Sequence, residues 1–227
     1  MNDSTLRRAV GLAGLFTAVL ILVEVPLYFV YSGPPPDGNV LTRTLFGLVG
    51  LTFLAVFMTG LRSVVIVSGS RMEPVGRLMT AAGLMWVTIE FVSKGLETGA
   101  VIAAPEPIDP TIAVTGTYLL YGTITRLVEA LFLVAFGFAV TRDRVLPLWT
   151  AWSAYLLAAI NLAFVPSIYF GNDPANFYAA NGWGTTASMG AVFMLWLLAV
   201  SVAVIRSAGA PAHRSAVAPG GPPPAER

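Results

Sequence analysis

Six long apolar segments, each about as long as a helix must be to cross a lipid bilayer, dominate this sequence of 227 residues. They lie at 9–31, 44–67, 78–104, 113–141, 148–170 and 184–205. Charged residues make up only 11% of the chain, against about 25% in a typical soluble protein. Because so few charges cannot cover that much apolar surface in water, the sequence predicts an all-α, polytopic membrane protein with a bundle of six transmembrane helices.

Short breaks rich in Gly, Pro and Asn separate the segments, for example at 32–39, 105–107 and 171–174. No break is long enough to hold a soluble catalytic or nucleotide-binding domain, and the sequence contains no phosphate-binding glycine motif. We therefore expect one transmembrane domain at 1–206. The remaining stretch, 207–227, is rich in Pro, Ala and Gly without apolar periodicity, which predicts a disordered cytoplasmic tail.

Arginines mark one side of the predicted membrane. They flank the first and last segments and fill the loops after the second and fourth: Arg7, Arg8, Arg71, Arg77, Arg142, Arg144, Arg206 and Arg214. The other three loops hold one base, Arg43, against the acids Asp37, Glu106, Asp109 and Asp173. Because basic residues next to a span resist translocation, the N- and C-termini are expected on the cytoplasmic side.

The composition removes several kinds of chemistry. Cysteine is absent, and the only histidine, His213, lies in the Pro-rich C-terminal stretch. The apolar segments therefore lack the thiolate and imidazole ligands of zinc, haem and iron–sulfur sites. The aspartate-rich motifs DDxxD and NxxxDxxxD, which bind magnesium diphosphates, are also missing. We expect no cofactor, no metal ion and no nucleic-acid partner.

Seven ionisable side chains lie within the apolar segments: Glu24, Arg62, Glu90, Lys94, Glu97, Arg126 and Glu129. Each costs about 2.5–3.5 kcal/mol at the centre of a spanning helix, so these side chains should face the bundle interior and pair. Glu90, Lys94 and Glu97 share one helical face, and Arg126 shares another with Glu129. Because the third and fourth segments run in opposite directions, we expect their charged faces to meet and neutralise one another near mid-membrane. Arg62, near the inner end of its segment, is expected to reach lipid phosphates.

Other polar groups extend this layer. Asn161 of the fifth segment lies at a similar depth and is expected to complete the layer through its amide. Glu24, Glu90 and Glu97 are candidate proton donors, because a carboxylic acid kept neutral by burial can give up a proton. Lys94, the only lysine beside twelve arginines, is compatible with proton exchange because an ammonium group can lose its proton. The alternative is that Lys94 is only a counter-ion for a neighbouring acid.

Pro26 and Pro166 lie in the outer halves of the first and fifth segments. A proline removes a backbone donor and bends a helix, so the outer helix ends should splay and leave a cavity above the charged layer. Its expected aromatic walls are Tyr28, Phe29, Tyr118, Tyr121, Tyr155 and Phe164. Alternatively, the prolines only shape helix packing. The candidate ligand-binding residues are accordingly Lys94, Arg126, Glu129, Asn161, Tyr28, Tyr121 and Tyr155.

The stretch 126–134 begins Arg-Leu-Val-Glu, and after a short basic loop 146–152 reads Leu-Pro-Leu-Trp-Thr-Ala-Trp. This combination resembles a large family of six-helix bacterial membrane proteins of unknown function, whose fourth helix tends to read Arg-(Ile/Val)-(Ile/Leu)-Glu. The resemblance covers the fourth and fifth segments. It implies the six-helix fold and a place in the bacterial cytoplasmic (inner) membrane, and it supplies no activity. The charged third segment departs from that family's pattern.

Three functions fit these features. The first is a non-enzymatic protein that binds or senses a lipophilic small molecule in the outward-opening cavity. The second is a metal-independent membrane acid–base enzyme on a hydrophobic substrate, such as a proton-initiated terpene cyclase, with Glu24, Glu90 or Glu97 as the donor. The third is a proton-coupled carrier that uses Glu90, Lys94 and Glu129 as a relay. A role as an accessory subunit of a larger membrane complex also stays open, as does the oligomeric state. Membrane lipid is the expected surrounding partner.

Overall fold

The computed structural model describes residues 2–67 and 69–209. Within these residues every regular element is a helix. Six helices are long and apolar enough to cross a membrane: Asp3–Leu27, Asp37–Val65, Glu73–Ala103, Thr117–Asp143, Leu148–Phe170 and Gly184–Ser207. The predicted all-α, multi-pass fold is confirmed. The tail predicted at 207–227 lies outside the described residues from position 210 onward.

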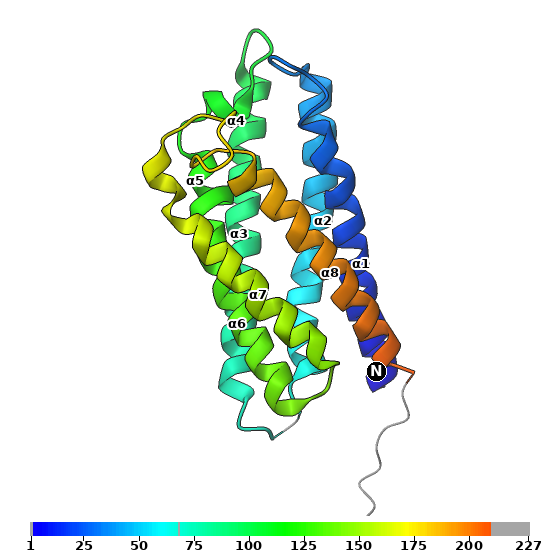
Figure 1. The fold of residues 1–227 in the computed structure, drawn as a ribbon. Helices are drawn as coiled ribbons and strands as arrows, with labels where there is room; N and C mark the ends of the chain where they lie inside the picture. Colours follow the sequence, from blue (N-terminus) through cyan, green and yellow to red (C-terminus); the bar gives the residue numbers. More distant parts are fainter. Residues whose placement is uncertain (1, 68, 210–227) are drawn as a thin grey trace, which may run out of the picture.

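Six α-helices form the bundle: α1 (Asp3–Leu27), α2 (Asp37–Val65), α3 (Glu73–Ala103), α6 (Thr125–Asp143), α7 (Leu148–Phe164) and α8 (Met189–Ser207). Five short elements extend or join them: α4 (Pro110–Ala113), α5 (Thr117–Leu119), the π-helix η1 (Leu120–Ile124), the 3₁₀-helix η2 (Val165–Phe170) and the π-helix η3 (Gly184–Ser188). Helix α1 packs between α2 and α8, α3 packs against α2 and α6, and α7 packs mainly on α6 (Figure 1). Helix α7 therefore lies at the outside of the bundle.

Several helix boundaries differ from the expected ones, and two of them bear on the site. Helix α1 ends at Leu27, one residue after Pro26, rather than at position 31. Helix α2 begins at Asp37, in advance of position 44, with this acid in the first turn, where the helix dipole favours a negative charge. Pro166 lies in η2, beyond the end of α7. Pro26 thus lies in the last turn of α1, and Pro166 lies where the span Leu148–Phe170 changes from α-helix to 3₁₀-helix. Arg43 belongs to α2 and not to a loop.

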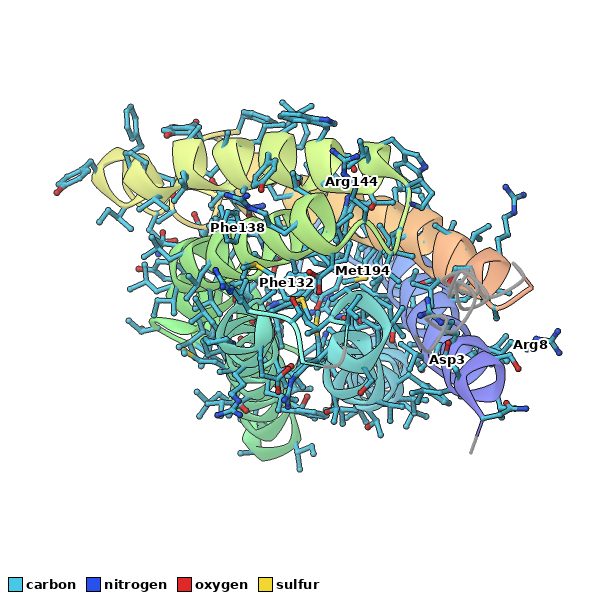
Figure 2. The ribbon with its side chains drawn as sticks, turned by 90° about the horizontal axis from the view of Figure 1, so that it is seen from below. Asp3, Arg8, Phe132, Phe138, Arg144 and Met194 are labelled. Atoms are coloured by element: carbon cyan, nitrogen blue, oxygen red, sulfur yellow. The ribbon has the colours of Figure 1, made fainter. Side chains whose placement is uncertain are left out.

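Aromatic rings fill the bundle interior between the middle of the spans and the end that holds the described N-terminus. The rings of Trp86 and Phe193 meet edge-on with centroids 4.6 Å apart, and those of Phe136 and Trp196 do so at 5.3 Å. Phe132 is fully buried beside them, and Figure 2 shows it inside the bundle. Edge-to-face pairs stabilise a core beyond the area that they bury. This aromatic core joins α3, α6 and α8.

The start of α1 and the end of α8 lie at the same end of the bundle, because Arg7 Nη1 donates a hydrogen bond to Ser207 Oγ at 3.2 Å. The connections from α2 to α3 and from α6 to α7 also lie at this end (Figure 1); Arg71 and Arg144 belong to them, and Arg77 and Arg142 lie in the adjoining turns of α3 and α6. We call it the arginine-rich end. Arg62 of α2 forms an ion pair there with Glu73 of α3. The sequence predicts a contact of Arg62 with lipid phosphates, but in the structure its charge is matched by an acid of the protein. Which side of the membrane this end faces stays a prediction.

Replacing Gly14 by a larger residue should loosen the contact of α1 with α2 and α8. A Cβ at Gly14 would lie 2.6 Å from Phe57 Cδ2 and would also meet Ser201 Oγ. Overpacking of this kind costs about 1–3 kcal/mol. Gly95→Val is the matched control, because a Cβ at Gly95 meets no atom within 4 Å. Thermal unfolding in detergent should show a lowered midpoint for Gly14→Val only, and equal midpoints would contradict this packing.

Candidate functional site

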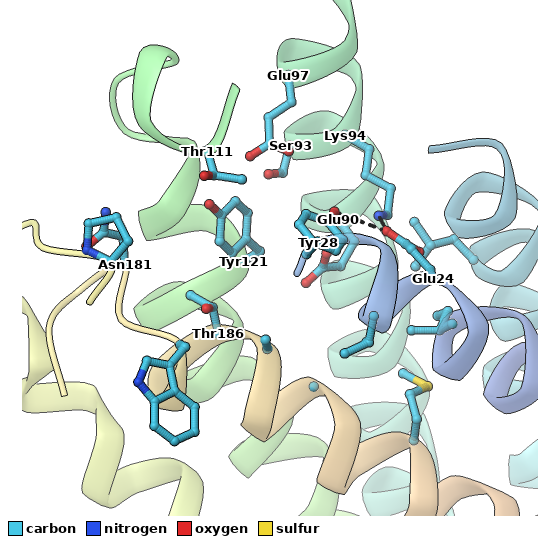
Figure 3. Close-up of a pocket in the computed structure, with 18 of the residues that line it drawn as sticks. Glu24, Tyr28, Glu90, Ser93, Lys94, Glu97, Thr111, Tyr121, Asn181 and Thr186 are labelled. Atoms are coloured by element: carbon cyan, nitrogen blue, oxygen red, sulfur yellow. Dashed lines mark hydrogen bonds and ion pairs between the residues drawn. The ribbon is translucent and has the colours of Figure 1, made fainter. Parts of the chain in front are cut away.

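A cavity of about 350 Å³ lies in the half of the bundle away from the arginine-rich end. Helices α1, α2, α3, α6 and α8 line it, together with η1, η3 and the loops before α4 and before η3. Exposed rim residues, among them Phe29, Pro174 and Trp183, connect the cavity to the outside of the protein. Figure 3 shows side chains from several of these elements directed into this space. A cavity is therefore present in the half of the bundle away from the arginine-rich end, and its opening toward the outer side of the membrane stays a prediction.

This cavity collects nearly all of the ionisable residues of the apolar segments. Six of the seven line it: Glu24, Glu90, Lys94, Glu97, Arg126 and Glu129. Three of the predicted aromatic residues, Tyr28, Phe29 and Tyr121, line it as well. The side chains therefore face a shared interior space instead of acyl chains, which is how a spanning helix can carry charge.

The ion pairs in the cavity differ from those expected. Lys94 of α3 pairs with Glu24 of α1. Arg126 pairs with Glu129 of its own helix, with Nη1 and Oε2 3.0 Å apart. In the described part of the chain, no ion pair joins α3 to α6. The predicted neutralisation between the third and fourth spans is therefore wrong. Glu24 reaches Lys94 from the last turns of α1, and the i, i+3 spacing lets Arg126 satisfy Glu129 locally.

Two cavity carboxyl groups are held by neutral donors. Glu90 accepts hydrogen bonds from Trp86 Nε1 at 3.3 Å and from Thr125 Oγ1 at 3.2 Å. Glu97 accepts one from Thr117 Oγ1 at 3.3 Å. Neither carboxyl group has a basic nitrogen of the described residues within ion-pair distance. Each is therefore free to hold a proton or to meet a positively charged ligand.

Side chains of three helices surround the Lys94–Glu24 pair. The Tyr28 hydroxyl donates to Glu24 Oε1 at 3.1 Å, and the Arg43 guanidinium stacks on the Tyr28 ring, 3.9 Å from its centroid. Gly47 of α2 leaves room for the pair, because a Cβ there would lie 2.6 Å from both Glu24 Oε2 and Lys94 Nζ. The ion pair thus depends on α1, α2 and α3 together.

Two predicted residues, Asn161 and Tyr155, lie elsewhere. Asn161 is fully buried, and its Nδ2 donates to the Leu157 carbonyl at 3.0 Å. Tyr155 packs on α6, where a Cβ at Gly137 would lie 2.9 Å from its ring. Neither residue lines the cavity, because α7 packs on the outer side of α6 and supplies none of the lining. Depth along a helix does not say which helices are its neighbours.

The sequence analysis missed some of the residues around the cavity. The sequence predicts Arg43 in a loop, but in the structure it lies in α2 and is only 3% exposed. The run of prolines before Asp37 could have corrected this, since an acid in the first turn predicts a helix start there. Trp86 and Ser93 lie on the face of α3 that carries Glu90, so helical periodicity could have found them. No such pattern points to Asn181 or Trp183, which reach the cavity from the loop before η3.

Three buried polar side chains of the cavity carry atoms without a partner. Ser93 Oγ, Asn181 Oδ1 and Arg126 Nε make no hydrogen bond to the described residues. Ser93 is 1% exposed, Asn181 7% and Arg126 2%, and all three line the cavity. More than about 90% of buried polar groups in proteins have a hydrogen-bond partner. We therefore expect these three atoms to bind water or a ligand.

The backbone is irregular on two sides of the cavity. Residues Leu120–Ile124 and Gly184–Ser188 are π-helices, and Gly122 has a non-helical conformation with φ −91° and ψ −113°. Tyr121 and Thr186, which line the cavity, belong to these segments. Irregular backbone at membrane depth is tolerated where protein buries it or where it lines a cavity, and π-helical turns recur at functional sites. The two π-helices therefore favour a functional role for this half of the bundle.

Comparison of the chain with protein-family models, with curated proteins and with solved structures gave no significant match. The resemblance to a six-helix bacterial family over the fourth and fifth segments therefore stays a prediction. The function proposed below draws its support from the geometry of the cavity.

Lys94→Met should destabilise the protein far more than Arg62→Met, which breaks the partly exposed Arg62–Glu73 pair. It leaves the buried Glu24 carboxyl without its base, and breaking a buried ion pair costs about 3–5 kcal/mol. Arg62→Met is the matched control, because the Arg62–Glu73 pair is over one third exposed on each side and such a pair contributes about 0–1 kcal/mol. The free energy of unfolding in detergent measures both. Adding Glu24→Gln to Lys94→Met should recover part of the loss, and equal losses for the two single variants would contradict the assignment.

Proposed function

We propose that this multi-pass membrane protein binds or senses a lipophilic small molecule in the cavity between α1, α3, α6 and α8. The observation that carries the proposal is the meeting of apolar walls and unpartnered polar atoms in one space. Ile21, Leu51 and Met194 supply apolar surface. Ser93, Asn181 and Arg126 supply buried atoms that lack a hydrogen-bond partner within the described chain.

The size of the cavity and its mixture of groups agree with this role. Small-molecule sites are typically apolar pockets of about 300–1,000 Å³ with a few polar groups that orient the ligand. A volume of about 350 Å³ falls in this range. The Lys94–Glu24 and Arg126–Glu129 pairs hold the surrounding side chains in place, so the ligand meets a largely preformed surface.

Gly190→Phe tests the proposal by filling the cavity. Gly190 lines it, and a Cβ at this position meets no atom within 4 Å, so the ring can enter the cavity without a clash at its base. Gly99→Phe is the matched control: its Cβ also meets no atom, and Gly99 does not line the cavity. The probe is tritiated farnesol, a neutral lipophile with one hydroxyl group, whose saturable binding is measured in nanodiscs against protein-free discs.

The unmodified protein and Gly99→Phe should bind farnesol with similar affinity, and Gly190→Phe should lose the saturable component. Saturable farnesol binding that survives Gly190→Phe would remove the support for a ligand site in this cavity.

A metal-independent acid–base enzyme is the second candidate, favoured by the two carboxyl groups that lack a counter-ion. Glu90 and Glu97 line the cavity together with Tyr28, Tyr121 and Trp86, and aromatic faces stabilise carbocations. In a proton-initiated cyclisation, a carboxylic acid would give its proton to an alkene carbon. The resulting cation would close a ring, and loss of a proton to the carboxylate would regenerate the acid. The net reaction is an isomerisation.

Incubation of the membranes with polyprenyl substrates, followed by mass spectrometry and chromatography, tests this candidate. A product that is lost in Glu90→Gln or in Glu97→Gln would support it, and unchanged substrate would count against it. The carrier hypothesis has less support. Glu90, Lys94 and Glu129 line the cavity, but the buried rings of Phe132 and Phe136 occupy the interior beyond them and would have to move.

A further inference from the structure

The acidic and basic groups that line the cavity are not equal in number. Five carboxyl groups line it, and only two basic groups, Lys94 and Arg126, do so: the acids are Glu24, Glu90, Glu97, Asp109 and Glu129. Each of the two bases is already paired with an acid of its own. Arg43 adds one basic group on the Tyr28 ring, 3.9 Å from its centroid. The acids still exceed the bases by two when Arg43 is counted.

The unpaired acids and an unpartnered hydroxyl share one face of α3. Glu90, Ser93 and Glu97 follow at i, i+3 and i+7, so they lie in a row along the helix. At 1.5 Å of rise per residue the Cα atoms of Glu90 and Glu97 are separated by roughly 10 Å along the axis. Ser93 lies between them, almost fully buried, with Oγ unpartnered among the described residues. Figure 3 shows this row on one side of the cavity. Lys94 lies on the same face, where Glu24 matches its charge, so the groups of the row that remain open to a ligand are two carboxyl groups and one hydroxyl.

Aromatic side chains supply the rest of the wall. Trp86, Tyr28, Tyr121 and Trp183 line the cavity around the acidic row. Aromatic faces attract cations because the ring quadrupole is negative above its plane. The Tyr28 ring already binds the Arg43 guanidinium in this way. A surface that combines excess carboxyl groups with aromatic faces favours a lipophilic cation and disfavours an anion of the same shape.

We infer that the ligand of this cavity is a monovalent lipophilic cation, an amine or a quaternary onium compound. Its charge lies beside the row of Glu90, Ser93 and Glu97, and its apolar groups lie against the aromatic wall. The inference rests on the proposed function, since it names the chemical class of ligand for the same cavity. Arg126 does not oppose it, because Glu129 matches the Arg126 charge at 3.0 Å. A proton on either unpaired acid would compete with the ligand for the same negative charge.

Two ions of the same shape and opposite charge test the inference. Tetraphenylphosphonium and tetraphenylborate are titrated against the protein in phosphatidylcholine nanodiscs, with protein-free discs subtracted. Saturable binding of the phosphonium should be at least about tenfold tighter than that of the borate, because the excess carboxylates attract one ion and repel the other. This comparison uses the unmodified chain, so it does not depend on the folding of a variant.

Substitutions then locate the charge. Glu90→Gln and Glu97→Gln should each weaken phosphonium binding by about tenfold or more. In Glu90→Gln, the amide oxygen can still accept the hydrogen bonds of Trp86 and Thr125, so the local structure is kept. Glu106→Gln is the matched control: it makes the same change on an exposed loop residue that does not line the cavity, and it should bind as the unmodified chain does.

The outcomes separate the two proposals. Equal binding of phosphonium and borate, or full phosphonium affinity in both glutamine variants, overturns the inference; farnesol binding that is lost in Gly190→Phe would then leave the proposed function standing. If neither farnesol nor phosphonium shows saturable binding that Gly190→Phe removes, both proposals are wrong. Charge-selective binding that is lost in Gly190→Phe and weakened in a glutamine variant supports both.

Discussion

The contact between Lys94 and Glu24 holds together the half of the bundle that contains the cavity. It joins α1 to α3 within the apolar part of the bundle, and Gly47 of α2 leaves the space that it occupies. A charge in the hydrocarbon costs several kcal/mol, so these helices cannot slide or rotate apart without exposing it. Tyr28 strengthens the same contact by donating to Glu24. The pair therefore fixes how α1 and α3 lie against each other where they line the cavity.

The bundle divides into two halves with different tasks. Toward the arginine-rich end, interlocked aromatic rings such as those of Trp196 and Phe136 fill the interior. In the other half, π-helices and the loop before η3 bring irregular backbone around a space lined by charged groups. One half therefore supplies rigidity and the other leaves polar atoms unsatisfied. A protein that only needed to span the membrane would gain nothing from burying Arg126 or Ser93 in this way, which is why we assign the cavity to a ligand.

Particular residues show how far the sequence could predict this site. The ionisable residues of the spans were recognisable, because a charge in an apolar segment is costly wherever it lies. Their partners were not: Arg126 meets its own-helix neighbour, and Lys94 meets α1 instead of α6. Asn161 has the expected depth but belongs to a helix that supplies none of the lining. Asn181 comes from a loop, where no periodicity indicates which way a side chain faces.

The amino-acid sequence alone predicts six apolar helices, two chain ends on one side of the bundle and ionisable side chains of the spans that turn inward. These properties depend on segment length and on the cost of placing a charge in hydrocarbon, and both are local to each segment. Only the tertiary structure decided which acid meets which base, where the cavity lies and why acids outnumber bases around it. Those properties depend on which helices are neighbours and on how each is rotated about its axis, and residues distant along the chain set both.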